Sequence, residues 1–197
     1  IRVISLANLS PLVRLTSNNP DQIKRVMDSG AHGVIVPMVN TREDAARAVE
    51  AVKYPPVGNR GVGLARAQGY GVDFQKYYRW QEDEAVVIVQ IEHIDAVNNL
   101  ERILSTEGVD GYIIGPYDLS GSMGIPGEFD HPEFLMAMEN IKRVAHGFVK
   151  PGGIHIIEPE PQQLQTRIDE GYCFIAYSLD IRMLDVACRE GIKVLNR

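Results

Sequence analysis

The sequence is poor in cysteine, in long hydrophobic runs and in clustered basic residues, and each shortage excludes a class of protein. Its two cysteines, Cys173 and Cys188, show neither metal-ligand spacing nor a framework of paired bridges, so we expect both to be reduced residues of the core. No apolar stretch approaches the roughly 20 residues needed to cross a bilayer, and no signal-peptide pattern is present. The formal net charge is −6, without a basic patch for nucleic acid. We therefore expect a cytoplasmic protein that binds neither membranes nor nucleic acid.

What the sequence does contain is an alternation of short apolar runs with longer segments of helical period, which is typical of α/β proteins. The apolar runs predict strands at residues 12–15, 33–36, 86–91, 111–114, 153–156 and 173–176. The helical periods predict helices at residues 20–29, 41–52, 93–105, 131–148, 160–170 and 180–190. One connection, residues 54–83, is long and irregular, so it either forms short helices or folds over a site.

Six βα units fit two architectures. One is a (β/α)8 TIM barrel whose first two βα units are missing from this chain, and the other is an open, doubly wound six-stranded sheet. Residues 1–7 have the amphipathic pattern of a helix already under way. We therefore favour the barrel, as one N-terminally incomplete domain over residues 1–197.

Two acidic residues, Glu92 and Asp118, stand at the C-terminal ends of two predicted strands. That end of the strands is where α/β barrels carry their active sites. Two carboxylates at one barrel mouth favour a divalent cation such as Mg, Mn or Co, with coordination positions left open for substrate. The alternative is that each acid caps the following helix or pairs with a basic neighbour.

Two further polar residues are expected at the same mouth. Gln90 lies two positions before Glu92, so both side chains project from the same face of the strand, where burial is costly without a function. The alternative is a polar pair at a solvated rim. Arg14 lies within a predicted strand and is expected to reach an anion at the mouth, where a guanidinium suits the stabilisation of an enolate. A purely structural ion pair is the alternative.

The segment from Gly115 to Asp118 leaves a strand and begins a short helix. Backbone N–H groups after Pro116 are therefore expected to point into the mouth and to receive a carboxylate. The alternative interpretation of this segment is an ordinary proline turn with an aspartate cap. Arg60, in a glycine-rich loop, is either a second anion contact or a solvated residue. The five histidines show no ligand spacing, and we assign none of them to the site.

An ordered set of motifs resembles one family, the metal-dependent pyruvate aldolases of the HpcH/HpaI aldolase/citrate lyase group. This group includes 4-hydroxy-2-oxoheptanedioate and 2-dehydro-3-deoxyglucarate aldolases. The motifs are PLVR at 11–14, GAHGVIVPMV at 30–39, YPP at 54–56, RGVG at 60–63, VQIE at 89–92 and GVDGYIIGPYDLS at 108–120. The resemblance extends from residue 11 to residue 180, and the ordered set is more specific than any one motif.

The resemblance implies roles for the residues of the mouth. Glu92 and Asp118 would ligate the divalent metal, and Gln90 would contact the pyruvyl group. The turn at Gly115 and the backbone amides of Tyr117 and Asp118 would bind the substrate carboxylate. Tyr117 stands where the family usually has a small residue, which would narrow the pocket and alter the choice of aldehyde.

The resemblance also implies a reaction. A 4-hydroxy-2-oxo acid would be cleaved to an aldehyde and a pyruvate enolate stabilised by the metal and by Arg14, without a Schiff-base lysine. Asp28 matches an acid that supports the family's catalytic histidine, although its position alone indicates a surface residue near a helix C-cap. That histidine lies upstream of Ile1, so we expect this chain to bind metal and pyruvate better than it turns over.

Two other functions remain open. The first is related enolate chemistry, as in decarboxylases or acyl-CoA lyases, although no basic cluster for CoA is evident. The second is a non-catalytic metal-binding barrel that serves as a scaffold or sensor. The expected partners are a small 2-oxo acid and an aldehyde, and by resemblance alone we expect a homo-oligomer, a hexamer.

Overall fold

The computed structural model describes residues 1–196, and its six strands form one parallel sheet. The strands are β1 (Leu12–Arg14), β2 (Gly33–Val36), β3 (Val86–Ile91), β4 (Gly111–Ile114), β5 (Gly152–Ile156) and β6 (Phe174–Tyr177). Every strand pairs with its sequence neighbour, and all five pairings are parallel. The six predicted strands are thereby confirmed to within about a residue at each end.

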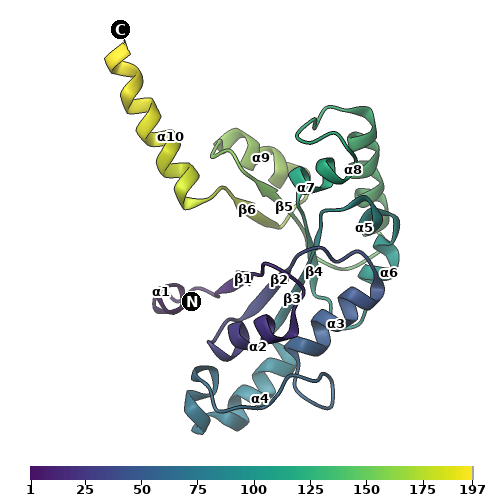
Figure 1. Cartoon of the computed structure of the whole chain (residues 1–197), viewed down its shortest axis with the longest axis vertical. Coiled ribbons are helices and arrows are strands. Elements are labelled where there is room, and N and C mark those ends of the chain that lie inside the picture. Colours follow the sequence, from purple (N-terminus) through teal and green to yellow (C-terminus); the bar gives the residue numbers. More distant parts are fainter. Residues whose placement is uncertain (197) are drawn as a thin grey trace.

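The strand order decides between the two predicted architectures. The order runs β1-β2-β3-β4-β5-β6 without a reversal, whereas a doubly wound sheet reverses its order at a switch point. The sheet curls into a partial barrel, and most of the helices lie along its outer side (Figure 1). The prediction of an incomplete (β/α)8 barrel is confirmed, and the open doubly wound sheet is wrong.

Helices connect the successive strands. They are α1 (Arg2–Leu6), α2 (Pro20–Asp28), α3 (Arg42–Val52), α4 (Phe74–Asp83), α5 (Ile94–Asn98), α6 (Leu100–Leu104), α7 (Pro116–Ser122), α8 (Pro132–Ala145), α9 (Pro161–Asp169) and α10 (Asp180–Ile192), with 3-10 turns η1 (Arg66–Gly71) and η2 (Lys193–Asn196). The helix predicted at 93–105 is divided at Asn99, which ends α5 and precedes α6. None of the helices described is long and apolar enough to pass through a membrane.

Side-chain caps fix where two of the outer helices begin. Asn19 accepts a hydrogen bond of 3.0 Å from the N–H of Gln22 at the start of α2. Thr41 and Asp44 form a reciprocal capping box at the start of α3. Because each cap satisfies backbone donors that would otherwise be unpaired, it sets the point at which the chain turns back along the sheet.

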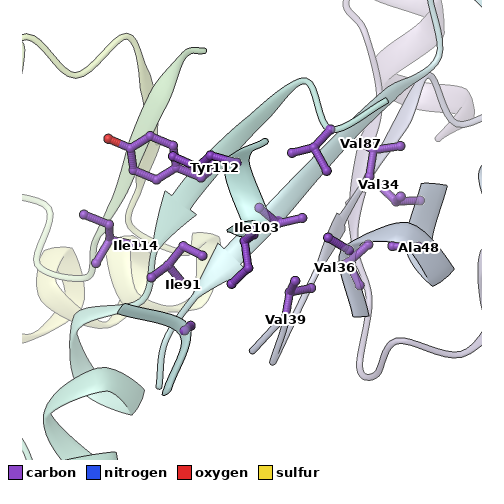
Figure 2. Close-up of a cluster of buried hydrophobic side chains, with 14 of the residues drawn as sticks. Val34, Val36, Val39, Ala48, Val87, Ile91, Ile103, Tyr112 and Ile114 are labelled. Atoms are coloured by element: carbon purple, nitrogen blue, oxygen red, sulfur yellow. The ribbon is translucent and has the colours of Figure 1, made fainter. Parts of the chain in front are cut away.

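The apolar core lies between the sheet and the outer helices. Alternate residues of the central strands point away from the barrel interior and pack against α3 and α6, as Figure 2 shows. The labelled members are Val34, Val36, Val39, Ala48, Val87, Ile91, Ile103, Tyr112 and Ile114. The intervening residues of the same strands face the opposite side, because side chains alternate along a strand. The inner face is therefore the one available for a site.

The long connection at 54–83 forms helices rather than a cover over the strand ends. It contains η1 and α4, and α4 is tied to the end of α3 by Lys53. The buried Lys53 ammonium donates to the carbonyls of Gln81, Glu82 and Ala85 at 2.8, 2.9 and 3.0 Å. Because the last carbonyls of a helix lack partners within the helix, this contact fixes the chain as it enters β3.

The prediction that both cysteines belong to the core is wrong. Cys173 and Cys188 are free thiols, as expected, but both are exposed. Cys173 immediately precedes β6, whose four residues are only partly buried, and Cys188 lies on α10, which has no buried residue. In Figure 1, α10 extends away from the sheet, so an apolar residue on it finds no core to enter.

Candidate active site

The inner face of the partial barrel encloses a cavity of about 420 Å³ at the C-terminal ends of the strands. Each strand contributes one residue to its lining, namely Arg14, Ile35, Gln90, Ile113, His155 and Ala176. The loops and turns that follow β4, β5 and β6 complete the wall. The site is thus built by the whole sheet, and three of its polar side chains, those of Arg14, Gln90 and His155, are carried by strands.

Glu92, Gln90 and Arg14 form one hydrogen-bonded network. The Gln90 side-chain amide donates to Glu92 Oε2 at 2.5 Å, and Arg14 Nε donates to Gln90 Oε1 at 3.1 Å. The Arg14 guanidinium lies 3.7 Å from Glu92 Oε2. Glu92 is 2% exposed, whereas half of the Arg14 side chain is exposed to the cavity and solvent. The predicted pairing of Arg14 with an anion is therefore present.

The second oxygen of Glu92 is held by the main chain. The N–H of Met38 donates to Glu92 Oε1 at 2.8 Å. Met38 follows β2 and adopts a left-handed conformation with φ of +52°, which is uncommon for a residue other than glycine. Backbone strain of this kind concentrates at functional sites. Residue-type patterns gave no indication of this donor, because the contact comes from the backbone.

The segment after β4 brings Asp118 to the same network. Gly115 lies beside Gln90 and Glu92 so closely that a Cβ there would stand 2.9 Å from Gln90 Nε2 and 3.1 Å from Glu92 Oε2. Pro116 is the first residue of α7, so Tyr117 and Asp118 lie in its first turn, where backbone N–H groups have no partners within the helix. Asp118 is exposed at the cavity wall, and its carboxylate interacts with that of Glu92.

The electrostatics of the pair suit a cation. Burial, together with the neighbouring Asp118, raises the pKa of Glu92, while the Met38 N–H and Arg14 oppose the increase. A divalent cation would relieve this repulsion and would find oxygen ligands of the type preferred by Mg²⁺ and Mn²⁺. The described residues contain no cluster of three or more ligand-type side chains. Glu92 and Asp118 are thus two carboxylates of the ligand type that such a cation prefers.

Two residues considered from the sequence lie elsewhere. Asp28 is the last residue of α2, at the edge of the sheet where strands begin, because α2 returns the chain from the end of β1. It pairs there with Lys24 at 2.5 Å and with Arg60 at 3.6 Å. Arg60 is buried, stacks on the ring of Tyr54 and donates to Tyr77 Oη, so the solvated interpretation of Arg60 is wrong.

Sequence reasoning missed two residues of the cavity wall, His155 and Ser178. His155 lies on β5, and burial together with the charge of Arg14 lowers its pKa. Ser178 follows β6 in a left-handed conformation with φ of +59°. The sequence did contain a signal for His155. Like Gln90, it occupies a strand position whose side chain points into the barrel.

Comparison with known proteins identifies relatives of the chain. The family model for HpcH/HpaI aldolase/citrate lyase matches residues 1–185. A pyruvate aldolase of Rhizobium etli is 40% identical over 185 residues, which cover 93% of this chain and 72% of that protein. A 4-hydroxy-2-oxo-heptane-1,7-dioate aldolase of Shigella flexneri is 40% identical over 177 residues, which cover 88% of this chain and 65% of that protein.

A solved structure agrees with these matches. An HpcH/HpaI aldolase/citrate lyase family protein from Burkholderia cenocepacia J2315 superposes with a TM-score of 0.91 at 32% identity, covering all of this chain and 78% of that one. The chain thus spans about two thirds of the length of the Shigella relative. The family and the names of the relatives indicate a carbon–carbon lyase.

Proposed function

We propose that this chain, which belongs to the HpcH/HpaI aldolase/citrate lyase family, is the catalytic barrel domain of an aldolase that cleaves a 4-hydroxy-2-oxo acid to pyruvate and an aldehyde. The observation that carries the proposal is the joining of Arg14, Gln90 and Glu92 in one network beside Asp118. A scaffold has no use for a guanidinium that lies beside a buried carboxylate and opens onto a cavity. An enolate-forming enzyme does, because negative charge develops on the keto oxygen as the C3–C4 bond breaks.

Each residue of the mouth has a part in binding. The free N–H groups at the start of α7 receive the substrate carboxylate, since helix N-termini favour anions. Arg14 and Gln90 then face the 2-oxo group from the sheet, and Arg14 stabilises the charge that appears on its oxygen. Gly115 leaves the space in which these groups approach one another.

We propose that Glu92 and Asp118 hold a divalent cation such as Mg²⁺, Mn²⁺ or Co²⁺. When bound, this ion would act as a Lewis acid on the 2-oxo acid. Glu92 is prepared for the role by the N–H of Met38 and the amide of Gln90, which fix the orientation of its carboxylate.

We propose that Tyr117 restricts the aldehyde. Its side chain is 48% exposed, and its ring packs edge-on against Phe129 with a centroid distance of 4.9 Å. Tyr117 lines both the mouth and a second cavity of about 360 Å³ between β5, α8 and α9. A bulky aldehyde would have to displace this ring, so small or flexible aldehydes are favoured.

We also propose a cytoplasmic homo-oligomer. The exposed thiols of Cys173 and Cys188 suit a reducing compartment. α10 extends from the sheet with no buried residue and carries exposed Ile181 and Leu184, an apolar surface that another subunit would cover. The predicted hexamer remains the specific proposal. Asp28 cannot serve its own mouth across the sheet, so any catalytic part for it belongs to a neighbouring copy.

The test is pyruvate release from 4-hydroxy-2-oxoheptanedioate by the full-length protein, measured with and without Mg²⁺, Mn²⁺ or Co²⁺. We expect metal-dependent release that Glu92→Ala reduces at least 100-fold. Glu101→Ala, at an exposed position on α6, is the matched control and should behave as the wild type. Absence of pyruvate release with every metal would overturn the proposed function.

A further inference from the structure

The cavity contains one polar side chain that binding of a 2-oxo acid does not employ. Arg14, Gln90 and Asp118 have parts in the proposed function, and Ser178 Oγ is already committed to the carbonyl of Ile157 at 2.7 Å. Besides Tyr117, whose ring is proposed above to restrict the aldehyde, the remaining polar side chain of the wall is that of His155. Among the described residues its imidazole has no hydrogen-bond partner, although imidazole nitrogens normally find one when partly buried.

The position of His155 is fixed by the sheet. It points inward from β5, which is two strands beyond β3, the strand that bears Gln90. The cavity residues around it, Ile113, Ile157 and Ala176, are apolar. Arg14 reaches towards it from β1, near enough for its charge to act on the imidazole. A 2-oxo acid bound by Arg14, Gln90 and the α7 amides would therefore face His155 on the opposite wall of the cavity.

The protonation state of His155 suits a base. Burial lowers its pKa, and the positive charge of Arg14 lowers it further, so the resting imidazole is neutral near pH 7. A neutral imidazole has one nitrogen with a free lone pair, and a general base must be unprotonated before it acts. Apart from His155, this wall offers apolar residues that cannot move a proton and Ser178, whose hydroxyl is already bonded to the carbonyl of Ile157.

We propose that His155 is a further catalytic residue, which carries the proton to and from C3 of pyruvate. In the condensation direction the imidazole takes a proton from C3, and the electron pair of the C3–H bond becomes the C2=C3 double bond of the enolate. The charge moves to the keto oxygen beside Arg14. In the cleavage direction an imidazole protonated from solvent returns the proton to C3, so pyruvate leaves as the keto acid. The inference rests on the proposed function.

The test isolates this step from carbon–carbon cleavage. Exchange of the C3 protons of pyruvate in D₂O, followed by NMR with the whole chain and Mg²⁺, involves neither the aldehyde nor the 4-hydroxyl proton. We expect the wild type to catalyse exchange and His155→Ala to slow it about 100-fold, the usual contribution of a general base. Pyruvate affinity, measured by calorimetry, should change less than threefold, because His155 is not required for binding.

Chemical rescue separates a proton carrier from a structural residue. Free imidazole should restore a substantial part of the exchange in His155→Ala, whereas His155→Phe, which fills the space, should be slow and should not respond. His146→Ala, at an exposed position after α8, should exchange as the wild type does. Undiminished exchange in both His155 variants would overturn the inference, while pyruvate release from the 4-hydroxy-2-oxo acid would show that the proposed function still stands. Slow exchange without rescue would also overturn it.

Discussion

The side-chain amide of Gln90 donates a 2.5 Å hydrogen bond to the carboxylate of Glu92, two residues further along the same strand. The same amide group accepts from Arg14 through its oxygen. Gln90 is therefore the link between the guanidinium and the carboxylate, and both depend on it for their orientation.

Replacing Gln90 with leucine should separate the two charged groups. Gln90→Leu keeps a similar volume but leaves Glu92 Oε2 and Arg14 Nε without this partner, at a cost of about 1–3 kcal/mol in unfolding free energy. Pyruvate affinity should fall about tenfold, which corresponds to about 1.4 kcal/mol. Urea denaturation and calorimetry measure the two effects. Gln162→Leu, exposed on α9, should alter neither, and an unchanged affinity in Gln90→Leu would contradict the link.

The absence of a side chain at Gly115 should be essential to the mouth. Gly115→Ala would place a Cβ 3.0 Å from Glu92 Cβ and 2.9 Å from Gln90 Nε2, so the network must shift, at a typical overpacking cost of about 1–3 kcal/mol. Gly121→Ala, on the short helix that follows Gly115, provides a control, since nothing lies within 4 Å of the added Cβ. We expect Gly121→Ala to gain about 0.5 kcal/mol, because alanine favours helix. Equal unfolding free energies of Gly115→Ala and Gly121→Ala would contradict the requirement for glycine at position 115.

The pH dependence of the unfolding free energy should report the raised pKa of Glu92. Its pKa is raised by burial and by Asp118, so the unfolded chain ionises Glu92 at a lower pH than the folded chain does. The contribution of Glu92 to the unfolding free energy is therefore largest below the ordinary carboxyl range, and it falls as pH rises towards the folded-state pKa. Glu92→Gln should remove this decline, as measured by urea denaturation of both proteins across pH. Mg²⁺ should stabilise the wild type at neutral pH but not the variant.

Lys53 should be the most costly lysine to replace by methionine. Its ammonium donates to two carbonyls in the last turn of α4 and to that of Ala85 just beyond the helix, although burial lowers its pKa. Lys53→Met leaves these acceptors without that donor, and we expect a loss of about 3 kcal/mol in unfolding free energy. Lys76→Met, exposed on α4, should change stability by less than about 0.5 kcal/mol. A small effect at Lys53 would show that water replaces the ammonium.

The sequence predicted the sheet well because apolar runs and helical periods are local signals. It also predicted that the side chains of Gln90 and Glu92 share one face of the sheet, because residues two apart on a strand point the same way. Position across the sheet is a different matter. Asp28 and Arg60 pair at the end of the sheet where the strands begin, opposite the mouth. This position becomes evident only from the path of α2, which returns the chain to that end. His155 joins the mouth through four intervening strand pairings from β1, which no local pattern records.

Contacts made by the main chain were equally invisible. The N–H that orients Glu92 comes from Met38, whose side chain is irrelevant to the bond. The burial of Cys173 and Cys188 was predicted wrongly for a related reason. Residue type favours burial, but β6 and α10 have too little of the described chain packed against them to enclose a thiol.

Burial is uneven across the sheet, so the side of the mouth formed by β3 is packed more tightly than the side formed by β6. Five of the six residues of β3 are buried, whereas the residues of β6 are only partly buried and α9 and α10 bury none. Local opening requires the least free energy where the fewest apolar contacts must separate. Among the described residues, local opening at β6 should therefore require less free energy than at β3, so the wall that bears the carboxylates holds its geometry more firmly than the opposite wall does.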